Sequence, residues 1–194
     1  MKKINREEIL DILAYEKLRP EFRKIIVRMK KHRRVTVGPK ITLMFENRDT
    51  VKFQIQEMLR IERIVDEKLI EHEIKTYNAL IPDDNELSAT MFIEITEKQS
   101  IKSELDRLVG LEKNSVFLKI GRYLIPAYFD EAQFSGFRIS AVQYIRFPFT
   151  PQQIHEMGNF NEQTSVVINH PKYKYDAEIP LAVRTTLLDD FGVE

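Results

Sequence analysis

The chain has 194 residues, of which 43% are hydrophobic and 31% are charged, and its formal net charge is zero. This composition is typical of a globular protein with one hydrophobic core, and it argues against a general polyanion binder. The absence of cysteine excludes disulfides, thiol catalysis and metal centres held by cysteine. No apolar run approaches the roughly 20 residues of a membrane-spanning helix, so we expect no membrane partner. The first residues, MKKINREEIL, lack the apolar stretch of a signal peptide, which favours a cytoplasmic protein.

The zero net charge hides an asymmetry between the two halves of the chain. Residues 1–80 contain 19 lysines and arginines against 13 aspartates and glutamates, a balance of +6, and the remainder contains 11 against 17, a balance of −6. The basic excess is concentrated in residues 28–34, at the end of the predicted helix over residues 20–31. Cations suit that position, because the helix dipole is negative at the C-terminal end of a helix. Nucleic-acid contact is the less favoured alternative, because no aromatic or glycine-rich recognition motif accompanies the basic run. The charges of that run, RMKKHRR, belong to Arg28, Lys30, Lys31, Arg33 and Arg34.

The first half of the chain has the pattern of helices around a short β-hairpin. Asn5 is a suitable N-cap for the first helix, and Pro20 suits the first position of the second. Gly38-Pro39 is a turn signal between two alternating runs, and Asn47 can cap a helix directly after the hairpin. The expected elements are helices over residues 6–15, 20–31, 48–65 and 66–80 and strands over residues 35–37 and 41–45.

After residue 82 the apolar period changes from about 3.6 to 2, which indicates strands. Strands are expected over residues 89–95, 115–120, 123–128, 139–147, 165–169 and 173–179. Further helices are expected over residues 100–109, after Thr150-Pro151, and over residues 180–190. The loop 130–138 could be a mobile contact loop that exposes Phe134 and Phe137, or it could fold back over the core.

These patterns predict an α+β fold in a single domain over residues 1–194. Its helical half, over about residues 1–82, contains the N-terminal helices and the short hairpin. Its β-rich half, over about residues 88–194, contains a largely antiparallel sheet and a C-terminal helix.

The helix that follows Asn47 is the most constrained stretch, because its apolar residues form two arcs at about 100° per residue. A helix that is apolar on two sides is usually buried on two sides. Glu62 projects into one arc and Glu57 into the other, so we expect both carboxylates to lie partly out of water, beside Arg60 and Arg63. The first arc contains Val51, Ile55, Met58, Leu59 and Val65, and the second contains Phe53, Ile61 and Ile64.

Two interpretations of this polar cluster stay open. The first is a structural ion-pair cluster that fixes how the helix docks. The second is a ligand or proton-handling site on the carboxylates, with Asp49, His72 and His170 as weaker candidates. A metal-binding version would combine Glu57 and Glu62 with a histidine, although no two of the four histidines have metal-ligand spacing.

The sequence contains none of the standard catalytic signatures. It has no glycine-rich dinucleotide or phosphate loop, no nucleophile elbow and no HExxH pair. Neither central helix carries the Glu-x-x-His pair of a di-iron bundle. The residues therefore point to no particular cofactor.

Five segments that span nearly the whole chain have a specific pattern: GPKITLMFENRDTVKFQIQEMLRIERIVDE, HEIKTYNALIP, ELSATMFIEI, RISAVQYIRFP and INHPKY. Together they resemble an uncharacterised bacterial family known as domain of unknown function 3501. The resemblance implies no established activity, cofactor or catalytic residue. It implies an association, because genes of the family often neighbour those of rubrerythrin-like di-iron proteins and iron–sulfur oxidoreductase subunits. Such proteins are the partners that the resemblance suggests, in peroxide or electron-transfer metabolism.

We therefore expect a cytoplasmic accessory or binding protein without catalysis of its own. The first alternative is an enzyme or metal-binding protein centred on Glu57, Arg60, Glu62 and Arg63. The second alternative is a nucleic-acid-binding protein that uses residues 28–34.

Overall fold

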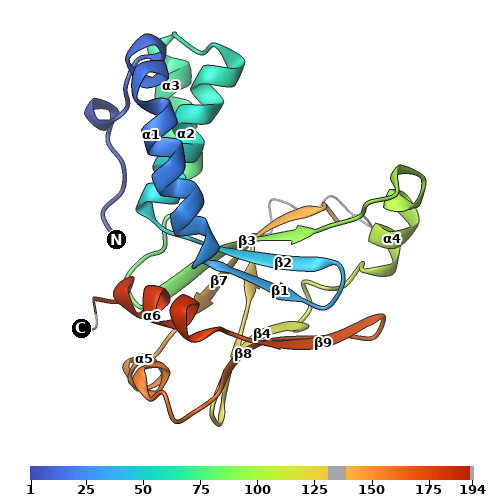
Figure 1. The fold of residues 1–194 in the computed structure, drawn as a ribbon. Helices are drawn as coiled ribbons and strands as arrows, with labels where there is room; N and C mark the ends of the chain where they lie inside the picture. Colours follow the sequence, from blue (N-terminus) through green and yellow to red (C-terminus); the bar gives the residue numbers. More distant parts are fainter. Residues whose placement is uncertain (131–138, 193–194) are drawn as a thin grey trace.

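The architecture is an arm of helices that stands on one end of two antiparallel sheets (Figure 1). The computed structural model describes residues 1–130 and 139–192. The loop expected over residues 130–138 therefore lies, apart from Asp130, outside the described residues. The α+β class expected from the sequence is confirmed.

The arm consists of the helices α1 (Ile12–Lys31), α2 (Arg48–Glu62) and α3 (Glu67–Asn78). Before α1 the chain forms only a short 3-10 turn, η1 (Arg6–Glu8), instead of the predicted helix over residues 6–15. The predicted helix start at Pro20 is also wrong, because α1 begins after Asp11 and runs through the proline. Asp11 caps it by accepting a hydrogen bond from the Ala14 N–H at 2.9 Å.

Packing explains why α1 tolerates Pro20. Tyr15 and Ile26, on either side of the proline, are each only 1% exposed, and the Tyr15 hydroxyl donates to Glu57 of α2. An internal proline costs a helix about 3 kcal/mol. Burial of two large side chains is worth about as much, so the helix continues.

Helix α2 is buried on two sides up to Leu59, as its two apolar arcs predict, but the arc members Ile61 and Val65 beyond it are exposed. Val51, Ile55 and Leu59 form a hydrophobic cluster with residues of α3, including Ile70 and Ile74. On the other side the Phe53 ring meets the Phe22 ring of α1, with centroids 5.8 Å apart. The predicted N-cap Asn47 is confirmed, since its side chain accepts a hydrogen bond from the Thr50 N–H. Asp66, expected as the first residue of the next helix, instead caps α3 by accepting from the Lys68 and Leu69 N–H groups.

The strands form two sheets instead of the one that the sequence predicts. The first sheet has the order β1-β2-β3-β7-β6, with β1 (Arg34–Val37), β2 (Ile41–Glu46), β3 (Glu86–Ile93), β7 (Val142–Pro148) and β6 (Tyr128–Phe129). The second has the order β5-β4-β8-β9, with β5 (Tyr123–Pro126), β4 (Val116–Ile120), β8 (Thr164–His170) and β9 (Tyr173–Glu178). All neighbours pair antiparallel. The predicted strand over residues 123–128 is thus divided, because the chain crosses from one sheet to the other after Pro126.

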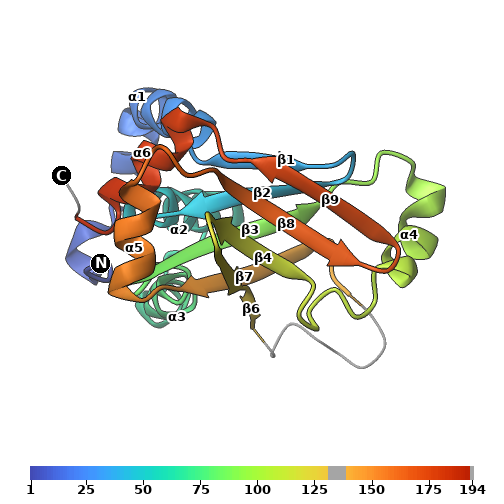
Figure 2. The same ribbon diagram turned by 90° about the horizontal axis from the view of Figure 1, so that it is seen from below.

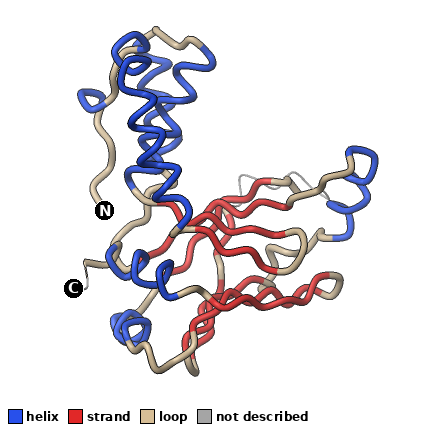
Figure 3. Tube along the Cα trace, viewed as in Figure 1, coloured by secondary structure: helices blue, strands red, loops and turns tan. Residues whose placement is uncertain are grey.

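One hydrophobic core fills the space between the two sheets, and Figure 3 shows the strands of both sheets on its two sides. Leu43 and Met91 of the first sheet and Leu118 and Val166 of the second are completely buried in it. At one edge Tyr173 joins the sheets, since its hydroxyl donates to the Val37 carbonyl at 2.6 Å. The hairpin β1–β2 is therefore part of the sheet structure, although it precedes α2 and α3 in the chain.

Three smaller helices lie around the sheets. Helix α4 (Ile101–Arg107), preceded by the 3-10 turn η2 (Lys98–Ser100), lies at the end of the sheets opposite the arm, as Figures 1 and 2 both show. The helices α5 (Pro151–Gly158) and α6 (Leu181–Asp189) lie at the same end as the arm. Within residues 1–130 and 139–192, no helix combines the length and apolarity that crossing a bilayer requires.

Candidate functional site

Glu57 is the centre of an ion-pair cluster between α1 and α2. Its Oε1 accepts hydrogen bonds from the Tyr15 hydroxyl and Arg19 Nε, both at 2.7 Å. Its Oε2 accepts from Arg19 Nη2 at 3.0 Å and from Arg60 Nη2 at 3.3 Å. The Glu57 side chain is only 17% exposed, so the prediction that this carboxylate is partly withdrawn from water is confirmed.

The electrostatics of this cluster favour a structural role. The hydrogen bonds from Arg19, and then from Tyr15 and Arg60, hold the pKa of Glu57 at about 2 in spite of its partial burial. Burial, together with the neighbouring Glu57 carboxylate, raises the pKa of the Tyr15 hydroxyl above its ordinary value. Near neutral pH Glu57 therefore stays ionised and Tyr15 stays protonated, so the cluster can fasten two helices but is poorly suited to exchange protons.

Glu62 and Arg63 do not join this cluster. Both are exposed at the end of α2, and the predicted burial of Glu62 is wrong. The reason is that α2 ends there: Arg63 has the left-handed backbone φ of 54°, which turns the chain out of the helix. Asp49, in the first turn of α2, is also exposed.

The histidine candidates lie apart from Glu57. His72 is exposed on α3. His170 is 5% exposed at the turn between β8 and β9, where its Nε2 lies 3.2 Å from the Val109 carbonyl and its Nδ1 accepts from the Lys172 N–H at 3.2 Å. Within the part of the chain that the structure describes, no three histidine, aspartate or glutamate side chains form a group that could hold a metal ion.

The basic run at the end of α1 is divided between surface and interior. Arg28, Lys31 and Arg34 are exposed, and the Lys30 ammonium lies 5.5 Å from the centre of the Phe53 ring. Arg33 is only 1% exposed, so its proposed contact with nucleic acid is wrong. The chain turns from α1 into β1 at this point and directs Arg33 inward, where it pairs with Asp190 and donates to the Phe45 carbonyl at 2.9 Å.

The free end of the arm carries an unusual share of exposed apolar side chains. We call the segments 10–17 and 61–71, which meet there (Figure 1), the arm tip. Its charged residues, all exposed, comprise six acids and three bases. Five large apolar residues of the tip are between 37% and 77% exposed: Leu10, Leu13, Ile61, Val65 and Leu69.

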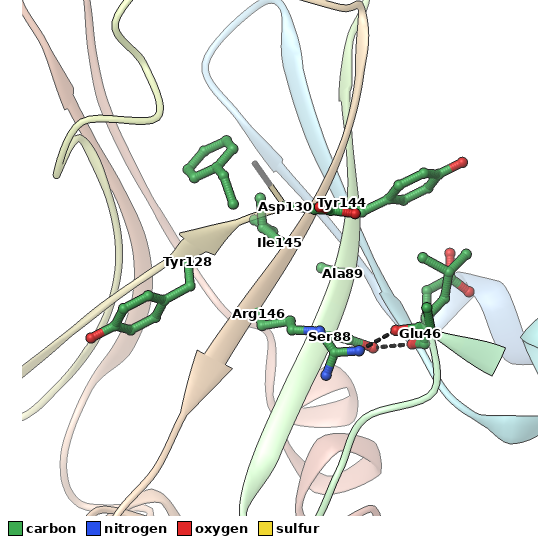
Figure 4. Close-up of a pocket in the computed structure, with 11 residues that line it drawn as sticks. Glu46, Ser88, Ala89, Tyr128, Asp130, Tyr144, Ile145 and Arg146 are labelled. Carbon is green, nitrogen blue, oxygen red and sulfur yellow. Dashed lines mark hydrogen bonds between the residues drawn. The ribbon is translucent and has the colours of Figure 1, made fainter. Parts of the chain in front are cut away.

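A cavity of about 340 Å³ lies at the foot of the arm, on the outer face of the first sheet (Figure 4). Arg146 donates there to the Ala79 carbonyl, and the Ser88 hydroxyl donates to the Leu80 carbonyl at 2.6 Å. The other lining residues are Glu46, Ala89, Tyr128, Phe129, Asp130, Tyr144 and Ile145.

Glu46 is the most buried charged group of this cavity, with 1% exposure. Its Oε2 accepts from the Thr50 hydroxyl at 2.5 Å, and its Oε1 accepts from the Thr90 hydroxyl at 2.6 Å. Burial, with a smaller contribution from the Glu46 charge, raises the pKa of the Tyr144 hydroxyl. The cavity thus combines a mostly apolar wall with one deeply buried carboxylate.

Comparison with known proteins places the chain in a family. The model of a family described as protein of unknown function, DUF3501, matches residues 3–191. The chain belongs to the DUF3501 family. A crystal structure described as that of a novel protein of unknown function from Burkholderia pseudomallei is 32% identical to it, with a TM-score of 0.90 over 97% of this chain and 99% of that chain. A comparison with curated proteins gave no match.

The DUF3501 match names no activity, so it assigns no role to Glu57, Glu46 or the arm tip. Sequence reasoning missed Arg19 as the main partner of Glu57, although a signal existed. Arg19 lies four residues after Tyr15, on the same helical face, where an apolar residue would be expected. A weaker signal marked Glu46, which closes the apolar strand ITLMF with an acid.

Proposed function

We propose that this DUF3501 protein is a cytoplasmic accessory protein, without catalysis of its own, that binds a partner protein through the arm tip. The observation that carries the proposal is the set of five exposed apolar side chains at the free end of the arm. Single exposed apolar residues are ordinary, but several on adjoining segments mark an interaction site.

The construction of the arm supports this role. A docking element must keep its shape away from the body of the protein. The Glu57 cluster ties α1 to α2, and Arg6 ties η1 to α3 through hydrogen bonds to both oxygens of Glu67, at 2.7 and 2.8 Å. These contacts give the tip a rigid base.

The charge of the tip indicates the kind of partner. Its apolar residues are accompanied by six acids and three bases, so the complementary surface is an apolar groove bordered by lysine and arginine. Two copies of the tip would place acid against acid. A membrane rich in anionic lipids would repel it for the same reason.

The family resemblance suggests partners in peroxide or electron-transfer metabolism, namely rubrerythrin-like di-iron proteins or iron–sulfur oxidoreductase subunits. The test measures the affinity of the purified chain for one protein of each kind from the same cell. The variant Leu13→Ser with Val65→Ser removes the two most exposed apolar side chains of the tip. Its matched control, Leu124→Ser with Leu181→Ser, removes apolar side chains that are 52% and 64% exposed outside the arm.

The proposal predicts that one of these proteins binds the native chain, that the tip variant loses at least about tenfold in affinity, and that the control does not. Equal loss in both variants would show that binding lies elsewhere. Failure of both candidate proteins to bind the native chain would overturn the proposed connection to their metabolism.

A further inference from the structure

Glu46 is a buried charge for which the described chain supplies no counter-charge. Its two hydrogen-bond donors, Thr50 and Thr90, are neutral hydroxyls. Among residues 1–130 and 139–192, no ion pair includes Glu46. A carboxylate withdrawn from water without a cation is costly, so such groups are usually paired or bind a ligand.

Two guanidinium groups, one beside the Glu46 backbone and one in the cavity wall, are committed to other acceptors. Arg33 donates to the main-chain carbonyl of Glu46 at 3.2 Å, but its ion pair is with Asp190. Arg146 forms an ion pair with Glu86 and donates to the Ala79 carbonyl. Neither neutralises the Glu46 carboxylate.

The remainder of the cavity suits an apolar body. Ala79, Leu80 and Ala89 contribute aliphatic surface to its lining. Tyr128 of β6 and Tyr144 of β7 add aromatic surface to the lining (Figure 4). A volume of about 340 Å³ lies within the range of small-molecule sites.

We infer that the cavity at the foot of the arm binds a small organic cation, an ammonium group on an apolar body, with Glu46 as its counter-charge. The ammonium lies on the Glu46 side of the cavity and the apolar body lies against the alanines and tyrosines. This site is separate from the arm tip, so it stands or falls independently of the proposed partner.

In the test, 2-phenylethylamine or n-hexylamine is added to the full chain. Calorimetry measures the affinity, and thermal unfolding measures the change in melting temperature. The matched controls are 2-phenylethanol, which has the same body without the charge, and phenylacetate, which has the opposite charge. We expect at least one amine to bind at least about tenfold more tightly than both controls and to raise the melting temperature. Equal affinity for the amine and the alcohol, or no binding of either amine at millimolar concentration, overturns the inference.

Two variants locate the site. Glu46→Gln keeps the acceptor for a threonine hydroxyl but removes the charge, and it should abolish the preference for amine over alcohol. Because this buried change could impair folding, the second variant is Tyr128→Ala, at a ring that is 59% exposed on the cavity rim. It should weaken amine binding several-fold, whereas Tyr175→Ala, at a tyrosine 44% exposed outside the cavity, should not. Unchanged amine binding in both Glu46→Gln and Tyr128→Ala would contradict the placement.

Discussion

Arg19 holds Glu57 by two parallel hydrogen bonds, Nε to Oε1 at 2.7 Å and Nη2 to Oε2 at 3.0 Å. The two residues are 38 positions apart in the chain, one on α1 and the other on α2. Paired bonds of this kind fix both the distance and the rotation of the two side chains. They therefore set how α1 lies against α2, and with it the position of the arm tip.

Glu57→Gln should lower the free energy of unfolding by about 1–3 kcal/mol at neutral pH, because it removes the charge that three donors share. Urea unfolding measures this change. Glu62→Gln is the matched control on the same helix, and since Glu62 is exposed it should have little effect. An equal effect of the two changes would contradict the assignment of Glu57 as the buried partner.

The same carboxylate predicts a pH dependence. The folded-state pKa of Glu57 is about 2, below the ordinary 4.5. Its ionised form is therefore favoured by folding, and its contribution to stability is complete above about pH 4.5 and is lost as the pH falls towards 2. Unfolding measured from pH 7 to pH 2.5 should show a smaller loss of stability in Glu57→Gln than in the native chain. Identical losses would contradict the pairing.

These contacts also show how much of the fold is readable from the sequence. Local signals were sufficient for the caps of α2 and α5, since Asn47 and Thr150 accept hydrogen bonds from N–H groups only three residues away. They were insufficient for Glu62, because its exposure depends on where the neighbouring helices stop. They were also insufficient at Pro126, where the chain changes sheets, because alternation does not reveal which strand a segment will pair with.

The candidate sites were less predictable than the fold. Helical spacing identified Glu57 and Arg60 as neighbours, since they lie three residues apart on α2. It could not identify Arg19, which reaches Glu57 through tertiary packing. The cavity is further removed from local pattern, because α3, β2, β3, β6 and β7 or the residues next to them all contribute to its wall.

Gly38→Ala should be strongly destabilising. Gly38 has a φ of +65°, and an added Cβ would lie 2.5 Å from Tyr175 Cγ and 2.7 Å from the Tyr173 hydroxyl. Backbone strain and overpacking together should cost at least about 2 kcal/mol. Thermal unfolding provides the measurement, and Gly158→Ala is the control, because a Cβ there meets nothing within 4 Å. If Gly38→Ala left the stability unchanged, the tyrosines of β9 would not pack against Gly38 as closely as these distances indicate.

Asp190→Ala should destabilise the protein by about 3–5 kcal/mol, because it leaves the buried Arg33 guanidinium without its carboxylate. The two side chains are 7% and 1% exposed. Replacing both, by Asp190→Leu with Arg33→Met, should recover part of the loss, since neither position of the pair then holds an unpaired buried charge. A double change that is no more stable than Asp190→Ala in urea unfolding would contradict this explanation.

Charge reversal at the arm tip should slow association with the partner. Glu62→Lys with Glu71→Lys removes two exposed acids from the tip and adds two bases, and it leaves the helix cap Asp66 in place. The association rate should fall, and the difference from the native chain should shrink as salt is added. Stopped-flow mixing at two salt concentrations measures both effects. Faster association would indicate an acidic partner surface and contradict the proposed complementarity.

The most direct measurement replaces single residues by a photo-crosslinking amino acid, at Leu13 or Val65 in the arm tip and at Leu124 or Leu181 outside the arm. Each chain is irradiated with the purified rubrerythrin-like or iron–sulfur protein, and the adducts are mapped by mass spectrometry. The proposed function predicts adducts from positions 13 and 65 to an apolar groove bordered by basic residues, and none from positions 124 and 181. Adducts from positions 124 and 181 alone would contradict it.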